Sequence, residues 1–190
     1  WNQNLAGNSG VVGAFHVQGV NWNFQSHENE ILDQSPAPLV ATVKPHDVET
    51  LRDHSGPFAV WRHKLSKLEY RSRGDSVMRV ALNHQDWEIF TVVPLQVARA
   101  NLLWGPIGLV DMLNSGGAIM EADNQLDYSS SGAVIRARLT SRGPGHFVAF
   151  TNRRPLHVLV DGLKVDYSYD EEDSELSFQL PEEADAVVGH

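Results

Sequence analysis

Short strand-like runs of apolar residues constrain the fold of this chain more than any other feature. Within most runs the apolar residues recur at strand-like spacings, and Gly, Pro or Asn-Ser clusters separate one run from the next. The runs that we predict to be strands are Val11–Val17, Leu39–Val43, Phe58–Arg62, Lys67–Arg71, Val77–Leu82, Trp87–Val93, Val97–Leu103, Val134–Thr140, Phe147–Asn152, His157–Val160, Lys164–Tyr167 and Glu175–Leu180. About twelve short strands in one domain need two packed sheets or a closed barrel to bury their apolar faces. We therefore predict an all-β fold: a two-sheet antiparallel β-sandwich with at most one or two short helical turns.

Local signals refine this prediction at three places. Arg136 and Arg138 alternate with apolar residues, which is typical of a strand buried on one face. Asp161-Gly162 stands between two strand-like runs and predicts a tight hairpin, because both positions tolerate positive φ. Pro45, followed by acidic residues, predicts the start of a short helical turn.

Composition excludes several classes of function. The 24 acidic residues outnumber the 15 Lys and Arg, and the resulting formal charge of -9 repels nucleic-acid backbones and anionic membranes. The absence of Cys excludes disulfides, thiolate metal sites and a Cys nucleophile. No apolar run reaches the roughly 18 residues that span a bilayer. We expect one soluble domain over residues 1–190, with neither nucleic acid nor membrane as a partner.

The chain offers no constellation of residues that predicts catalysis. Its nine His are scattered and lack metal-site spacing, so we predict no metal and no cofactor. A retaining glycosidase needs two carboxylates about 5 Å apart, and no such pair can be assigned. The acidic run Asp170–Asp173 is typical of a charged loop between strands, and there is no Gly-x-Ser-x-Gly elbow or phosphate-binding Gly loop. Our prediction for catalytic residues is therefore none.

Aromatic residues leave one candidate for ligand binding. Exposed rings can stack on the apolar face of a sugar, and the chain has five Trp and four Tyr. Trp61 and Trp87 lie within strand-like runs, which favours packing in the core. Trp22 lies in the Gly- and Asn-rich stretch Gln18–Asn23, which is typical of a loop. Trp22 is thus the candidate sugar-binding residue, and packing against a neighbouring domain is the competing interpretation.

Four colinear segments resemble one known family. They are Gly10–Trp22, Lys44–Glu49, Gly56–Trp61 and, most specifically, Gly105–Ile119 with the sequence Gly-Pro-Ile-Gly-Leu-Val-Asp-Met-Leu-Asn-Ser-Gly-Gly-Ala-Ile. These segments are similar to the C-terminal region of the raffinose synthase, stachyose synthase and alkaline α-galactosidase family, which is glycoside hydrolase family 36. The chain departs from the family pattern at His16-Val17, where the family has Asn-Cys, at Asn21, where it has a second Gly, and at Asp111, where it has Asn.

The resemblance implies a division of labour within a longer protein. Members of this family carry their catalytic Asp pair in a barrel that precedes the region matched here. The chain opens at Trp1 rather than Met, and we expect it to be the C-terminal part of a cytoplasmic protein. Its partner would be that barrel, which hydrolyses or transfers α-galactosyl groups, as a retaining α-galactosidase or a galactosyltransferase does. The chain alone is expected to be inactive.

Two further hypotheses about function stay open. The chain could be an independent carbohydrate-binding module whose ligand is an α-galactoside oligosaccharide bound at Trp22. The least favoured hypothesis is a complete small hydrolase.

Overall fold

The computed structural model describes residues 1–74, 77–98, 101–129, 132–181 and 185–189. Its strands form three five-stranded sheets and two two-stranded ribbons, and every pairing is antiparallel. The prediction of an all-β antiparallel fold with only short helical turns is confirmed. The stacked sheets are consistent with a sandwich, although the strands divide among more sheets than the two that we expected.

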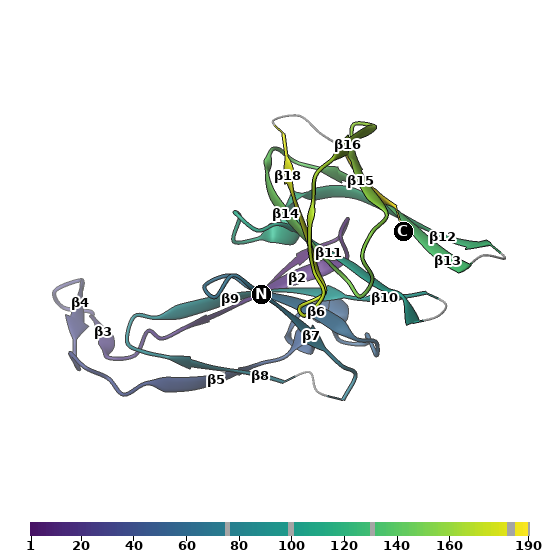
Figure 1. Ribbon diagram of the computed structural model, residues 1–190. Helices are drawn as coiled ribbons and strands as arrows, with labels where there is room; N and C mark the ends of the chain where they lie inside the picture. The colour runs from purple at the N-terminus through teal and green to yellow at the C-terminus, as the bar shows by residue number, and fades with distance from the viewer. Residues whose placement is uncertain (75–76, 99–100, 130–131, 182–184, 190) are drawn as a thin grey trace.

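The first sheet comes from the first half of the chain (Figure 1). In spatial order its strands are β1 (Asn2–Asn4), β2 (Ser9–Phe15), β9 (Trp87–Pro94), β6 (Phe58–Arg62) and β7 (Lys67–Arg71). One face packs against a ribbon formed by β5 (Leu39–Val43) and β8 (Met78–Leu82). Two single-turn 3-10 helices, η1 (Pro45–Asp47) and η2 (Glu49–Leu51), help to close this core with Val48 and Leu51. The helical turn predicted at Pro45 is therefore present.

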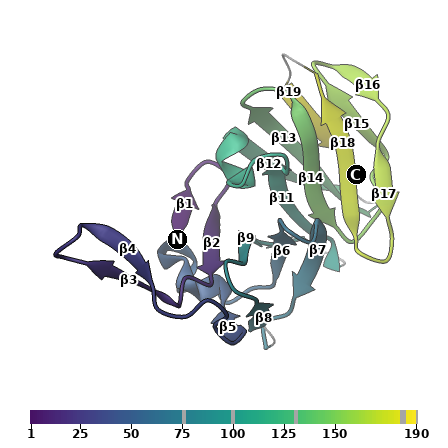
Figure 2. The ribbon, with the colours of Figure 1, turned by 90° about the vertical axis from the view of Figure 1, so that its left-hand side faces the viewer.

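The second and third sheets form the other half of the molecule (Figure 2). The second sheet has the order β10 (Gln96–Val97), β11 (Leu103–Leu109), β14 (Gly145–Thr151), β18 (Glu175–Leu180) and β17 (Ser168–Asp170). The third sheet has the order β12 (Ile119–Ser129), β13 (Gly132–Ser141), β19 (Asp185–Gly189), β15 (His157–Val160) and β16 (Leu163–Val165).

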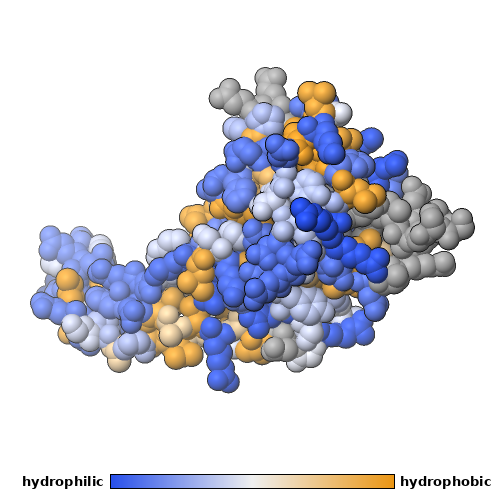
Figure 3. All heavy atoms as spheres, in the orientation of Figure 1, coloured by the Kyte–Doolittle hydropathy of each residue, from blue (hydrophilic) through white to orange (hydrophobic). Residues whose placement is uncertain are grey.

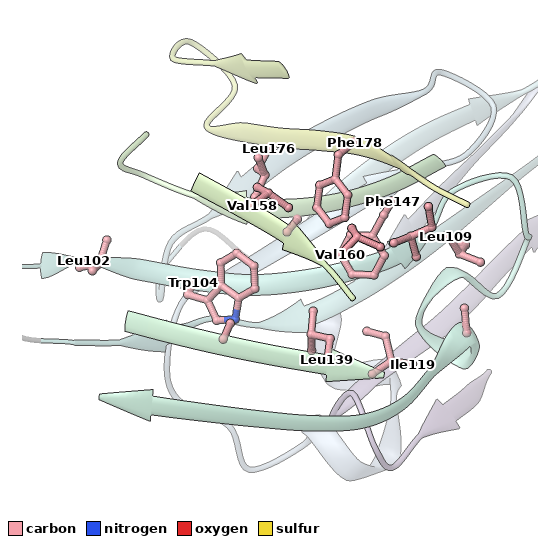
Figure 4. Packing of buried hydrophobic residues seen from close by; sticks show 14 of the residues in the cluster. Leu102, Trp104, Leu109, Ile119, Leu139, Phe147, Val158, Val160, Leu176 and Phe178 are labelled. Carbon is pink, nitrogen blue, oxygen red and sulfur yellow. The ribbon is translucent and has the colours of Figure 1, made fainter. Parts of the chain in front are cut away.

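The second and third sheets enclose the largest core (Figure 4). Trp104 and Phe147 from the second sheet meet Leu139 and Val158 from the third, and all four side chains are fully buried. Arg136 and Arg138 are exposed while Leu139 is buried, as the alternation predicted. In the β15–β16 hairpin, residues 161 and 162 have φ of 50° and 78°, which confirms the predicted tight turn.

A third core joins the two halves. Trp61 and Val93 of the first sheet pack against Ile107 of β11 and Phe150 of β14. Strand β11 therefore contributes Trp104 to one core and Ile107 to the other. The segment Gly105–Ile119, which is the most specific part of the family resemblance, begins within this strand.

The turn that follows β11 depends on glycine at position 108. Gly108 has φ of 107°, and a Cβ there would lie 2.1 Å from the carbonyl oxygen of Ser115. Ser115 precedes β12 in the single-turn helix η4 (Ser115–Ala118) and is fully buried. On the same loop, the side-chain amides of Asn114 and Asn4 bond to each other reciprocally at 2.7 and 3.1 Å. The loop between β11 and β12 is therefore bonded to the N-terminal strand β1 and packs closely against Gly108.

Several strand predictions were wrong or incomplete. Val97–Leu103 is not a strand: β10 ends at Val97, Asn101 has a turn conformation with φ of 56°, and β11 begins at Leu103. Strands β1, β12, β17 and β19 were missed, as was most of β11. A ribbon of β3 (Val20–Asn23) and β4 (Glu28–Ile31) was missed too, and it projects from the body of the molecule (Figure 1). We call residues 20–31 the arm.

No helix among the described residues is long and apolar enough to cross a lipid bilayer.

Substituting Gly108 tests the importance of the close approach between β11 and η4. Gly108→Ala is expected to lower the free energy of unfolding by about 3 kcal/mol or more, because it combines left-handed backbone strain with a steric clash. Gly143→Ala is the matched control: Gly143 also has positive φ, at 81°, but its Cβ would meet no atom within 4 Å. The control should lose only about 1 kcal/mol. Equal losses in urea denaturation of the two variants would contradict the role given to Gly108.

Candidate functional site

The arm is a β-hairpin with one apolar and one polar face. Val20 pairs with Ile31 and Trp22 with Asn29, so these four side chains share a face. The opposite face carries Asn21, Asn23, Glu28 and Glu30, and the Asn23 amide donates to the Glu30 carboxylate across the strands. At the tip, the Asn23 side-chain oxygen accepts the backbone N–H groups of residues 25 and 26 at 2.7 and 3.1 Å. These local bonds stabilise a hairpin whose strands have few β-branched residues.

Gly19 closes the base of the arm. Its carbonyl oxygen accepts the backbone N–H groups of Leu32 and Asp33 at 2.7 and 3.2 Å. Its φ is 89°, and a Cβ at this position would lie 2.7 Å from the carbonyl oxygen of Asp33. The two ends of the arm can therefore meet only where residue 19 has no side chain.

His16 anchors the chain on both sides of this base. Its ring is buried, with Nε2 3.0 Å from the carbonyl oxygen of Ala37. The backbone N–H of Gln18 donates to Nδ1 at 3.4 Å, which leaves Nε2 as the protonated nitrogen that donates to Ala37. His16 therefore acts as a structural residue that ties the end of β2 to the segment following the arm.

An aromatic pocket of about 500 Å³ lies where the arm meets the first sheet. Phe15 and Trp87 occupy directly opposed positions on β2 and β9, and Trp22 comes from β3. The exposed fractions of Phe15, Trp22 and Trp87 are 59%, 43% and 36%. Three large rings thus remain accessible to a ligand in one concave site, which is the arrangement expected of a small-molecule pocket.

Polar groups complete the lining of the aromatic pocket. Seven polar or ionisable residues contribute to its lining: Gln18, Asn21, Asn29, Gln85, His16, His84 and Asp86. The side chain of Asp86 bonds to the ammonium of Lys64, and this bond is the main reason that the pKa of Asp86 lies below its usual value. Asp86 also accepts the backbone N–H of Trp87 at 2.9 Å. Its charge is therefore already paired.

The structure revises the interpretation of two tryptophans. Trp22 is half exposed, as proposed for a ligand-binding residue, but it lies in strand β3 rather than in a loop. Trp87 was predicted to lie in the core, and this prediction was wrong because Trp87 stands at the exposed first position of β9, two residues before the buried Ile89. Trp61 is buried as predicted. Sequence reasoning missed Phe15, since only the register between β2 and β9 brings it beside Trp87.

Among the described residues, the acidic groups considered for catalysis are held in local structure. The run Asp170–Asp173 begins in the last residue of β17 and continues into a turn, where Asp170 accepts the backbone N–H groups of Glu172 and Asp173. Glu88 is buried, but it is engaged by Arg62 at 3.4 Å and by two backbone N–H groups. Among the residues that the structure describes, no group of three or more His, Asp or Glu could hold a metal ion.

A Ser–His contact occurs in the interior, at the junction of the two halves. His63 Nε2 lies 3.1 Å from the Thr91 hydroxyl and 3.4 Å from the Ser115 hydroxyl. Ser115 and Thr91 are fully buried, so a substrate has no access to either hydroxyl. Burial also lowers the pKa of His63, because the charged imidazolium loses its hydration. The contact is structural.

The lowered pKa of His63 predicts loss of stability in acid. A His whose pKa is lower in the folded than in the unfolded state binds fewer protons when folded, so stability rises with pH across this window. The melting temperature should therefore fall as the pH drops below about 6.5. His63→Gln should flatten this pH dependence, whereas His27→Gln, at an exposed position of the arm, should leave it unchanged. Thermal melts from pH 5 to 8 that coincide for His63→Gln and the unsubstituted chain would contradict this role.

Comparison with known proteins adds a sequence relationship to this geometry. The profile of the family described as raffinose synthase or seed imbibition protein Sip1 matches residues 1–180. The chain is 33% identical to probable galactinol–sucrose galactosyltransferase 1 of Arabidopsis thaliana over 95% of its own length and 24% of that protein. It is 31% identical to galactinol–sucrose galactosyltransferase of Pisum sativum, over 90% of the chain and 21% of that protein. Stachyose synthase of Pisum sativum is 27% identical, over 89% and 20%.

Proposed function

Because this chain belongs to the raffinose synthase or seed imbibition protein family, we propose that it is the non-catalytic C-terminal domain of a protein that processes α-galactosyl groups. In this proposal the chain docks against the catalytic barrel of the same protein and supports it. The bond-breaking residues belong to the barrel, and the domain comprises residues 1–190.

The extent of the sequence match supports a role as part of a longer protein. The chain spans about a fifth to a quarter of the length of the relatives that it matches. Those relatives are named for galactosyl transfer from galactinol to sucrose and for stachyose synthesis. We therefore favour galactosyl transfer over hydrolysis as the reaction of the parent protein, with an α-galactosidase as the alternative.

The observation that carries the docking proposal is the set of exposed apolar residues on the arm and its flanks. Four of them are exposed by 65% to 81%: Phe24, Ile31, Leu32 and Val40. In Figure 3, apolar residues also gather where the arm leaves the body of the molecule. Single exposed apolar residues are ordinary, but a group on a projecting segment and the chain next to it is typical of an interaction surface.

The chemistry of the arm also favours a protein surface as its partner. A two-stranded hairpin is marginally stable by itself, so an arm that projects into water gains stability when its apolar face is covered. The carboxylates of Glu28 and Glu30 on the other face can stay in water at the rim. The barrel of the parent protein is the occupant that we propose for the exposed apolar residues at the tip of the arm and beside its base, outside the pocket that Trp22 lines.

An independent carbohydrate-binding module is the second candidate function. The aromatic pocket favours it, because Trp22, Trp87 and Phe15 remain accessible there. A module of this kind would act without docking, and substitutions at the exposed tip of the arm would leave its activity unchanged.

Charged substitutions on the arm test the docking. The chain and the catalytic region of the parent protein, expressed together as separate polypeptides, should co-elute in gel filtration and restore galactosyl transfer. Phe24→Asp and Leu32→Asp should each weaken this association by about 2 kcal/mol, since each removes an apolar contact and buries a carboxylate. Leu163→Asp is the control, because Leu163 is 73% exposed on β16 in the third sheet. Docking through the arm and the residue next to it is wrong if Phe24→Asp and Leu32→Asp associate as tightly as the control.

The chain alone should show no glycosidase activity. Incubation with an aryl α-galactoside is expected to release the phenol no faster than buffer does, because Glu88 is buried and paired and Asp170–Asp173 lies in a solvated turn. Turnover that is above buffer, saturable and lost on Glu88→Gln would establish the complete small hydrolase instead.

A further inference from the structure

The walls of the aromatic pocket come from two separate parts of the fold. Phe15 and Trp87 form a cross-strand pair at one end of the first sheet, and Trp22 belongs to the arm. Leaving such large rings in contact with water forgoes the stabilisation that burial would bring. A ligand with an apolar face would recover part of it by packing on these rings.

The polar lining restricts the chemistry of that ligand. The amides of Gln18, Asn29 and Gln85 each offer a donor and an acceptor, which matches hydroxyl groups that do the same. None of the described residues that line the pocket is Lys or Arg, and the carboxylate of Asp86 is paired with Lys64. An anionic ligand would therefore find no counter-ion, in a chain whose net charge is already -9. A purely apolar ligand would leave amide groups buried without partners.

We infer that the aromatic pocket is a binding subsite for a neutral saccharide, with a sugar ring packed on Trp22 and the Phe15–Trp87 pair and its hydroxyls bonded to the surrounding amides. Galactose is a suitable ring, because its axial hydroxyl leaves one face with a continuous patch of C–H groups for an aromatic wall. The volume of about 500 Å³ lies within the range of small-ligand sites. The subsite does not depend on the docking proposal.

The subsite is held in shape before a ligand arrives. Gly19 fixes where the arm leaves the sheet, through its bonds to Leu32 and Asp33. His16 lies beside Phe15, and its ring centroid is 5.9 Å from that of His84. Its Nε2 donates to the carbonyl oxygen of Ala37, which follows the arm in the chain. A pocket whose walls are already in place loses less conformational entropy when a ligand binds to it.

Titration of the 190-residue chain with sugars tests the subsite. Calorimetry and tryptophan fluorescence would be measured with galactose, melibiose, raffinose and stachyose, and with galacturonate as the charged counterpart of galactose. Saturable binding in the millimolar range is expected for the neutral sugars, and galacturonate should bind at least about tenfold more weakly. Flat titrations with all the neutral sugars, or equal affinity for galacturonate, would overturn the inference.

Matched substitutions assign any binding to this pocket. Trp22→Ala and Trp87→Ala should each weaken binding by about tenfold or more, whereas Trp22→Phe, which keeps a ring, should lose less. Phe24→Ala is the control, because Phe24 is 81% exposed on the arm and does not line the pocket. Equal losses in Phe24→Ala and Trp22→Ala, with unchanged circular dichroism, would overturn the assignment. Phe24→Asp separates the two proposals, since it should weaken docking and leave sugar binding intact.

Discussion

The close approach of β11 to the η4 turn is the contact on which the arrangement of the two halves depends. Strand β11 faces two cores at once, with Trp104 packed towards the third sheet and Ile107 packed towards the first. The chain must then turn sharply into β12 without disturbing either core. Gly108 permits the turn because the carbonyl of Ser115 occupies the space of a side chain. The reciprocal amide pair of Asn4 and Asn114 attaches β1 to the same loop.

This junction explains why much of the most family-specific segment is buried. Residues 105–119 contribute buried packing, a left-handed glycine and hydrogen bonds within the interior, and each of these requirements admits few residue types. The departure at Asp111 is compatible with the same architecture, because its side-chain oxygen accepts the backbone N–H of His146 at 2.7 Å, and an Asn oxygen can do the same. The family resemblance in this segment therefore reflects how the two halves of the molecule are packed together. It does not by itself identify a ligand site.

Local sequence patterns predicted strands wherever alternation and turn residues agreed. Strands β5, β6, β7, β15 and β18 have the bounds expected from the sequence, and the match to residues 1–180 confirms the family resemblance. Strand β11 was mostly missed because Gly105, Pro106 and Gly108 are unusual within a strand, and here they accompany a register shift between Pro106 and Gly108. The arm was missed because Val-Asn-Trp-Asn and Glu-Asn-Glu-Ile have weak strand propensity. Trp87 was assigned to the core because the sequence pattern predicts a strand but does not show whether another layer of the fold covers the first residue of that strand.

The arm links the two surfaces that we propose, and its geometry allows them to act separately. Trp22 lines the pocket from β3, while Phe24 follows the strand at the tip and belongs to none of the three cores. A partner that covers the tip would restrain the hairpin, and a restrained hairpin would hold Trp22 at a fixed position relative to Phe15 and Trp87. Docking would then lower the entropy cost of sugar binding. By linkage, docking and sugar binding would strengthen each other by the same free energy. Because the coupling passes through the backbone of β3 and β4, its strength depends on how rigidly Gly19 and His16 hold the base of the arm.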